Sequence, residues 1–356
     1  LLMAHAGTGE GTKAESEFNT VLGMNKPKND YYSPFKAMIE SAKQSSIRIA
    51  SRIFLSDEKD QEINPVFRQW MDANFFPSYQ QVNFKDKAGA LRVINGWASQ
   101  ETNQKINSVF EDLPSHSALV LANAVYGKGQ WQAKYETQSS KFTFCVGPKA
   151  DSSNCDWPTK TFKGKNGGFT FKLKGDPFIG VELKSKLNGI SLWALTKARS
   201  GKSFPGPAWM DSYLASGESF KAVDQAFREN SNTIPFKMPM FKMNLFDAKA
   251  KETLRTMGFN DVYQESKTNF RPMFKKDGKG KIGDIAHKSM IGVTHEEFEA
   301  AAISAVVMTY RGVGGFGEKI EEVVLDHPFI FYLVNTNTTP ASILFAGIYN
   351  DASASE

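Results

Sequence analysis

Histidines and acids are the side chains most able to do catalytic chemistry here, but their spacing forms no catalytic motif. The five histidines are scattered along the chain: His5, His116, His287, His295 and His327. A zinc site of the HExxH type needs a second histidine four residues after the first, and the segment 295–299 (HEEFE) ends in glutamate instead. No GxSxG turn is present, and no acid pair stands out from the surface charge. We therefore expect no enzyme, no metal site and no cofactor.

A phosphate-binding loop is also rejected. Gly201, Lys202 and Ser203 match the end of such a loop, in which backbone amides and a lysine hold phosphate groups. The motif needs another glycine five residues earlier, where this chain has Thr196.

The two cysteines, Cys145 and Cys155, lie ten residues apart around a polar stretch. A disulfide closing this stretch is expected if the protein is secreted, whereas two free thiols are expected in a reducing compartment. Neither cysteine belongs to a CxxC pair, so the sequence does not favour a metal or redox site. Both pairing states remain open.

Composition predicts a large hydrophobic core and excludes two classes of partner. The chain has 356 residues, of which 41% are hydrophobic, and 28 are phenylalanine. A net charge of +5 is mild and requires no nucleic acid. No apolar run approaches the roughly 18 residues of a membrane span. We expect neither nucleic-acid binding nor a membrane-spanning segment.

The stretch 293–329 is difficult to interpret as regular structure. It reads VTHEEFEAAAISAVVMTYRGVGGFGEKIEEVVLDHPF. Ala300, Ala301 and Ala302 favour helix, whereas Ile303 and the valines that follow favour an extended chain. The glycines from 312 to 317 end any regular element and predict an exposed loop. The alternative is a helix end followed by a glycine loop.

With its flanks, this stretch resembles the serpins, serine protease inhibitors that present a long bait loop. Residues 293–307 resemble the family's hinge, and 326–331 (DHPFIF) resemble its DHPFxF signature. Residues 121–126 and 342–347 match further motifs in the family's order. The resemblance also covers single residues placed where the loop enters the main sheet or in the structure around it: Trp131, His287, Pro328 and Phe329.

This resemblance implies an α+β fold of mixed β-sheets surrounded by helices. It implies one domain over residues 1–356, with the exposed reactive loop at about 295–322. The start of the chain matches the end of the family's second helix, so the first helix and first short strand are expected to be missing. The resemblance further implies a monomeric, secreted, extracellular protein whose signal peptide is not present in this chain.

In the family, a serine protease cuts the loop as a substrate, and the cut loop then inserts as a new strand into the main sheet. Arg311 stands sixteen residues beyond His295, which matches the hinge's opening glutamate. The resemblance therefore predicts Arg311–Gly312 as the reactive bond. Arginine fits the pocket of a trypsin-like serine protease, which we expect as the partner. Tyr310 and Lys319 are alternative bait positions, and an exposed arginine without this role is the simpler interpretation.

The hinge departs from the family's pattern at two positions. Its residues are Glu296, Glu297, Phe298, Glu299, Ala300, Ala301 and Ala302. Glu297 replaces the usual glycine, which removes backbone freedom. Phe298 replaces the usual threonine on the core-facing side, where overpacking typically costs about 1–3 kcal/mol. These departures keep a second function open, that of a non-inhibitory serpin acting as a binding or carrier protein or as a plain protease substrate.

Local signals predict the elements around the loop. Caps at Thr12, Asn64 and Asp86 predict helix starts, and Ser33-Pro34 predicts another. Alternating or continuous apolar runs predict strands at 47–55, 82–84, 118–124, 169–174, 180–183 and 190–195, and a helix is predicted at 221–230.

A basic group follows the Ser33-Pro34 signal, at Lys36, Lys43 and Arg48. In the family, a helix at this place sometimes binds sulfated polysaccharide, so that class of partner is retained. A solvated basic helix face is the alternative, and it is the favoured interpretation.

Overall fold

The computed structural model describes residues 1–24, 27–44, 47–58, 62–113, 117–146, 155, 157–200, 203–214, 219–230, 234–247, 250–276, 280–285, 287–298 and 322–350. The chain divides into two compact units. The first contains Leu1–Gly127 and Asn244–Met290, and the second contains Lys128–Met243 and Ile291–Glu356. Among the described stretches, no helix is long and apolar enough to cross a membrane.

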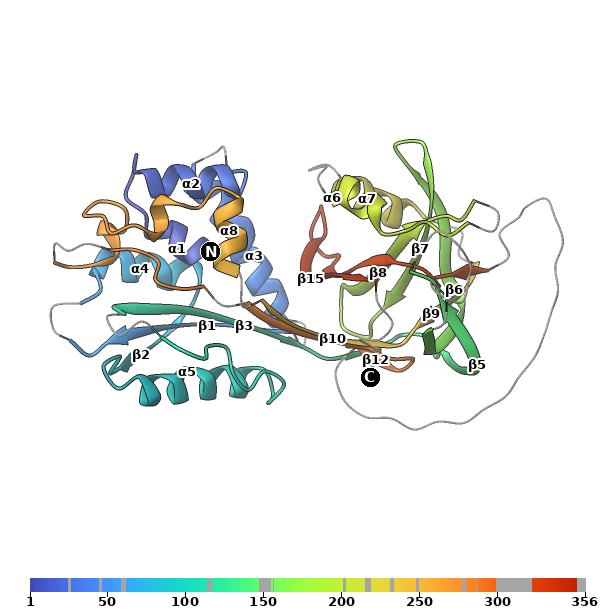
Figure 1. Ribbon diagram of the computed structural model, residues 1–356, viewed down its shortest axis with the longest axis horizontal. Coiled ribbons are helices and arrows are strands. Elements are labelled where there is room, and N and C mark those ends of the chain that lie inside the picture. The colour runs from blue at the N-terminus through green and yellow to red at the C-terminus, as the bar shows by residue number, and fades with distance from the viewer. Residues whose placement is uncertain are drawn as a thin grey trace. The chain divides into compact units, whose positions relative to one another are not determined.

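The first unit combines helices with a small sheet (Figure 1). Its helices are α1 (Leu2–Ala6), α2 (Lys13–Val21), α3 (Lys28–Gln44), α4 (Pro65–Asn74), α5 (Lys87–Glu101) and α8 (Ala250–Thr256), with 3-10 turns η1 (Asp261–Tyr263) and η2 (Arg271–Met273). Its strands are β1 (Ile47–Ser56), β2 (Ser78–Val82) and β3 (Leu119–Gly127), in the order β2-β1-β3.

Three predicted helix starts are confirmed by their caps. The Oγ1 atom of Thr12 accepts the Glu15 amide at 3.3 Å, just before α2. The side chains of Asn64 and Asp86 do the same for α4 and α5, each at 2.9 Å. In each case an oxygen satisfies a backbone donor that the first helical turn leaves without a partner.

The predicted start at Ser33-Pro34 is wrong, because α3 begins at Lys28 and contains Pro34. A proline has no amide hydrogen and disfavours a helix interior, so packing must hold the preceding turn. Tyr32 supplies that packing. It is only 1% exposed, its ring lies 4.6 Å from that of Trp70, and its hydroxyl lies 2.9 Å from Nδ1 of His5.

The sheet of the first unit is covered on both faces. Ile53 and Phe54 are consecutive in β1 and both fully buried, so their side chains point to opposite faces. Ile53 packs in a cluster with residues of α1, α2, α3 and α4, and Phe54 packs with Trp97 of α5. Figure 1 shows α5 on one side of β1 and β3 and the other helices on the opposite side.

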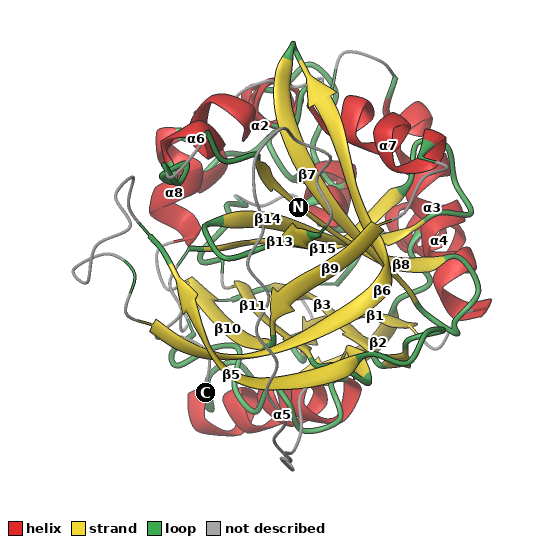
Figure 2. Cartoon of the chain, turned by 90° about the vertical axis from the view of Figure 1, so that its right-hand side faces the viewer, coloured by secondary structure: helices red, strands yellow, loops and turns green. Residues whose placement is uncertain are grey.

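The second unit is built mainly on a larger sheet. Its elements are β4 (Gly129–Gln130), β5 (Glu136–Phe144), β6 (Trp157–Leu173), β7 (Asp176–Lys184), β8 (Ile190–Lys197), α6 (Ala208–Leu214), α7 (Ser219–Glu229), β9 (Ile234–Pro239), β12 (Glu297–Phe298), β13 (Val323–Val324), β14 (Phe329–Asn335) and β15 (Ser342–Tyr349). An eight-stranded sheet has the order β13-β9-β6-β7-β8-β14-β15, with β5 paired to β6. Figure 2 shows β6 beside β7 and β9.

Aromatic side chains fill the core of the second unit. Phe227 of α7 stacks on Trp193 of β8, with ring centroids 4.7 Å apart. A second aromatic group joins Phe241, Phe329 and Tyr349, and the last two are stacked at 5.0 Å. All five side chains are at most 4% exposed, so this unit has the large apolar interior that the composition predicts.

Two further strands, β10 (Phe241–Asp247) and β11 (His287–Val293), each contain residues of both units. They belong to a four-stranded sheet in the order β10-β11-β12-β4. Two strand predictions need correction. The strand predicted at 82–84 lies earlier, as β2, and the strand predicted as buried at 118–124 is β3, most of which is half-buried.

Candidate functional site

A tight turn follows β11 and leads into the predicted hinge. The amide and the hydroxyl of Thr294 both donate to the Glu297 carbonyl, at 2.9 and 3.1 Å. The same hydroxyl oxygen accepts the amides of Glu296 and Glu297, at 3.3 and 3.2 Å. Threonine suits this position because its hydroxyl can bond backbone groups two or three residues away. The turn reverses the chain, so residues 297 and 298 run back along β11.

These two residues form β12, a strand paired on both sides. Phe298 lies opposite Val293 of β11, and Glu297 and Phe298 lie opposite Gln130 and Gly129 of β4. Both pairings are antiparallel. The first residues of the predicted loop therefore already occupy a strand position between β11 and β4.

Phe298 is fully enclosed at this position, with 1% of its surface exposed. Its ring lies 5.5 Å from that of Trp131, between centroids. A Cβ atom on Gly129 would come within 2.5 Å of the Phe298 ring and 2.7 Å of Ser185 Oγ. Glycine at 129 therefore leaves the room that the ring fills. We call the surface formed by Gly129, Trp131 and Ser185 the hinge seat.

Trp131 is bonded to the turn as well as packed on Phe298. Its indole Nε1–H donates to the Thr294 carbonyl at 2.9 Å, and its amide donates to the Glu296 carbonyl at 3.0 Å. The side chain is 2% exposed. Because an indole has only a donor to satisfy, this single bond completes its polar requirement. Trp131 is thus both a buried core residue and a direct contact of the hinge.

An ion pair adds a charged contact at the edge of the seat. Nζ of Lys128 lies 3.0 Å from Oε1 of Glu297, and the two side chains are 45% and 19% exposed. The pair is therefore only partly solvated. Glu297, which the sequence presents as a departure from glycine, has an opposite charge within contact distance.

The segment 322–328, beyond the predicted loop, is held by separate contacts. Strand β13 pairs in parallel with β9, and the Leu325 amide donates to the Lys237 carbonyl at 2.9 Å. The Asp326 carboxylate forms an ion pair with Arg199 and lies 3.0 Å from Nδ1 of the fully buried His327. These polar groups fix the chain just before β14.

The DHPF segment continues into the core. The Pro328 carbonyl accepts the Thr196 hydroxyl at 2.7 Å, and the Phe329 side chain is fully buried in β14. The Cys145 amide donates to the Asp326 carbonyl at 2.8 Å, and Cys145 is bonded to Cys155 in a disulfide. The structure therefore selects the disulfide from the two pairing states that the sequence leaves open.

Comparison with known proteins identifies the family of this chain. The sequence profile described as Serpin (serine protease inhibitor) matches residues 1–153 and 212–352. The chain belongs to the serpin family. The predicted resemblance is confirmed, and the family consists of protease inhibitors by description rather than of catalytic enzymes.

Individual serpins match at modest identity. Iripin-1 from Ixodes ricinus is 28% identical over 367 residues, covering 98% of this chain and 86% of that protein. Serpin-ZX from Arabidopsis thaliana is 28% identical over 305 residues, covering 82% and 73%. Solved serpin folds superpose closely. Thyroxine-binding globulin in complex with thyroxine gives a TM-score of 0.77 at 18% identity, covering 99% of this chain and 89% of that one. Cleaved Serpin 42Da gives 0.75 at 22%, covering 98% and 88%. The α+β serpin fold is thereby confirmed.

The remaining loop residues predicted for this serpin lie outside the described residues. They are Glu299, Ala300, Ala301, Ala302, Tyr310, Arg311, Gly312 and Lys319. Of the other predicted residues, Trp131, Glu296, Glu297 and Phe298 come together at the hinge seat. His287 begins β11, and Pro328 and Phe329 lie at the start of β14.

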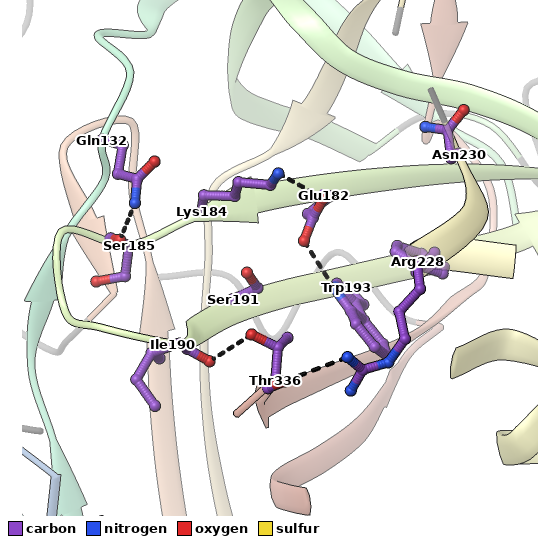
Figure 3. Close-up of a pocket in the computed structure, with 12 residues that line it drawn as sticks. Gln132, Glu182, Lys184, Ser185, Ile190, Ser191, Trp193, Arg228, Asn230 and Thr336 are labelled. Carbon is purple, nitrogen blue, oxygen red and sulfur yellow. Dashed lines mark hydrogen bonds and ion pairs between the residues drawn. The ribbon is translucent and has the colours of Figure 1, made fainter. Parts of the chain in front are cut away.

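A cavity of about 440 Å³ lies elsewhere in the second unit, between α7 and the strands β7 and β8 (Figure 3). The nearly buried rings of Trp193 and Phe227 are among its lining residues, and Glu182, Lys184 and Arg228 contribute charges. The charges are largely engaged. Glu182 accepts the Trp193 indole N–H at 3.1 Å, and Lys184 lies 3.7 Å from the same carboxylate. The cavity is therefore a polar recess whose aromatic lining residues are almost fully buried.

Sequence reasoning did not find Lys128, Ser185 or this cavity. Lys128 meets Glu297 across 169 positions of sequence, so no local pattern links them. Ser185 follows β7 in a stretch where the family motifs are sparse. The one available signal was the Gly129 and Trp131 match, which marks the strand that receives the hinge.

Proposed function

We propose that this serpin inhibits a trypsin-like serine protease by reactive-loop cleavage and insertion, with Arg311–Gly312 as the bait bond. One observation carries the proposal. Glu297 and Phe298 are already paired as a strand between β11 and β4. A loop whose first residues hold this position needs only to extend that strand to insert further.

The chemistry follows from the bait residue. The protease's serine oxygen attacks the Arg311 carbonyl, the bond to Gly312 breaks, and the Gly312 amine leaves with a proton. The products are an ester between the protease and Arg311 and a new amino terminus at Gly312. If the strand grows before water hydrolyses the ester, the protease is carried along and held. If hydrolysis is faster, the serpin is released as a cut substrate.

Two features of the structure, one at the hinge and one beyond the loop, bear on whether insertion or hydrolysis is faster. The enclosure of Phe298 beside Gly129 supports insertion, because the larger side chain has space at the position where overpacking is expected from sequence. The segment 322–328 is fixed through Asp326 and Leu325, which supports a loop anchored at its far end while its near end moves.

The test is to mix the protein with trypsin at near-equal amounts, then analyse denaturing gels and fragment masses. Inhibition predicts a band at the summed mass that survives denaturation, and a released peptide that begins at Gly312. An Arg311→Ala variant and trypsin with a blocked active site are the controls, and neither should give the band. Clean cleavage with trypsin still fully active would refute the proposal.

A non-inhibitory binding or carrier function is the second candidate. The cavity near α7 favours it, since the charged groups of Lys184 and Arg228 line it together with the nearly buried ring of Trp193. The structurally similar thyroxine-binding globulin is described in complex with thyroxine. Calorimetric titration with an aromatic anion, 8-anilinonaphthalene-1-sulfonate, tests the cavity directly, with Trp193→Ala as the variant that should lose binding.

Hinge variants separate the two functions. Replacing Glu297 with Gly and Phe298 with Thr restores the residues that the resemblance predicts. A large gain in trapped complex would indicate that the native hinge limits inhibition, which favours the carrier function. An unchanged or lower yield would support the native hinge as competent.

Three further properties complete the proposal. The Cys145–Cys155 disulfide supports an oxidising, extracellular location, since such bonds persist there. The similar protease nexin-1 is described with heparin, which keeps sulfated polysaccharide as a partner class. Arg48, however, is paired with Glu101 at 3.5 Å, which reduces its availability for that role. We expect the serpin to act as a monomer.

A further inference from the structure

Lys128 places a positive charge beside the hinge, just before the strand that pairs with it. It immediately precedes β4 and lies 3.0 Å from the Glu297 carboxylate. Gln130, two residues later, is directly opposite Glu297 in the register. Side chains two residues apart on a strand share a face, and diagonal neighbours across two strands are within reach of long side chains. The ion pair therefore bridges the hinge and its receiving strand.

We propose that Lys128 is a positioning residue that holds the hinge in its seat through Glu297. Phe298 supplies a buried apolar contact, and the ion pair of Glu297 with Lys128 supplies a directional contact next to it. The resemblance predicts a glycine at position 297, and a glycine has no side chain to form such a pair. The structural part of this proposal stands alone, and its consequence for inhibition rests on the proposed function.

The consequence concerns the relative rates of loop insertion and of hydrolysis of the ester. With the ion pair intact, residues 297 and 298 are in place before a protease cuts the loop. Loss of the pair should increase the fraction of molecules with the hinge out of its seat, by about two- to fivefold, the effect of a partly exposed ion pair. More cut molecules should then follow the substrate path, so more serpin should be consumed for each protease molecule trapped.

Hydrogen–deuterium exchange of the full chain, without protease, tests the structural part. The informative amides are Trp131, which donates to Glu296, and Thr294, which donates to Glu297. We expect Lys128→Met to speed their exchange about two- to fivefold at low salt and less at high salt, since salt screens exposed charges. Lys128→Arg should keep native exchange. Lys134→Met, at an exposed lysine on the same segment, is the matched control.

A charge-swapped double variant, Lys128→Glu with Glu297→Lys, should restore slow exchange that each single change loses. Equal exchange in Lys128→Met and Lys134→Met would overturn the proposal. So would an effect that neither salt nor the swap changes, because that pattern indicates packing alone. Trapping assays with trypsin are read separately. If the native protein traps nothing, the proposed function fails while the exchange result still decides the role of Lys128.

Discussion

Removing the Phe298 ring should release the hinge without unfolding the protein. The side chain is 1% exposed and contacts Trp131, so Phe298→Ala leaves an empty space in the hinge seat. Phenylalanine-to-alanine changes at buried sites cost about 3–5 kcal/mol. We take the lower value, about 3 kcal/mol, because the ring belongs to a two-residue strand, which can relax more than a long core strand. That value corresponds to about a 150-fold increase in local opening.

The assay is amide exchange at Thr294 and Trp131, compared with global stability in urea. We expect the two amides to exchange about two orders of magnitude faster, and the free energy of unfolding in urea to fall by up to the same value of about 3 kcal/mol, because only the closed state has the packing that is lost. Phe76→Ala, the same change at a 38% exposed side chain in the first unit, is the control and should leave these amides unchanged. Unchanged exchange in Phe298→Ala would refute the seat as described.

Gly129, which lies opposite Phe298 in β4, allows a more specific test of the space that the two residues share. Gly129→Ala should open the hinge on its own, because the new Cβ would lie 2.5 Å from the Phe298 ring. In the Phe298→Ala background the same methyl group no longer meets the ring and keeps only its close contact with Ser185 Oγ. The double variant should therefore be less disturbed than the sum of the two single changes, since neighbouring positions are not additive. Simple additivity would mean that the two residues do not share one space.

Three other predictions follow from single contacts. Burial lowers the pKa of His5 to about 4, below its ordinary 6.5. Between these two pH values the unfolded chain binds more protons than the folded protein, so the free energy of unfolding should fall by up to about 3 kcal/mol as the pH drops from 6.5 to about 4. His5→Gln should flatten that pH dependence in urea unfolding, and an unaltered slope would contradict it. Trp131→Phe removes the indole bond to Thr294 and should weaken the hinge by about 1 kcal/mol, read by exchange; native exchange rates would argue against that bond. Arg199→Met leaves Asp326 without its cation and should lower the free energy of unfolding by about 2 kcal/mol, and an unmoved urea midpoint would exclude it.

Sequence reasoning succeeds where the cause of a structure is local. The caps at Thr12, Asn64 and Asp86 act within three residues, and each starts a helix as predicted. The start at Ser33-Pro34 fails because its competitor is not local. Tyr32 is held by His5 and Trp70, distant in sequence, and their contacts stabilise helical turns before the proline that intrinsic preference would not favour.

The same distinction separates the parts of the candidate site. Trp131 is found from sequence because a motif marks it, although its bond to Thr294 spans 163 positions. Lys128 carries no motif, and a lysine before a glycine is ordinary in sequence. Only the antiparallel register, which sets Gln130 opposite Glu297, brings that lysine to the hinge. Charge partners across strands depend on register, and register is a property of the folded sheet.

The two hinge departures, taken singly, argue against insertion, but the structure pairs each with a compensating residue. The ring of Phe298 fills the space that Gly129 leaves, and the charge of Glu297 meets Lys128. Reverting only one member of either pair should therefore do harm even when the new residue is the family's usual one. Phe298→Thr would leave space beside Gly129, and Glu297→Gly would leave Lys128 without this carboxylate. If these reversions weaken the seat, the hinge of this serpin functions as a matched set of four residues, and its competence has to be judged from those pairs rather than from each position alone.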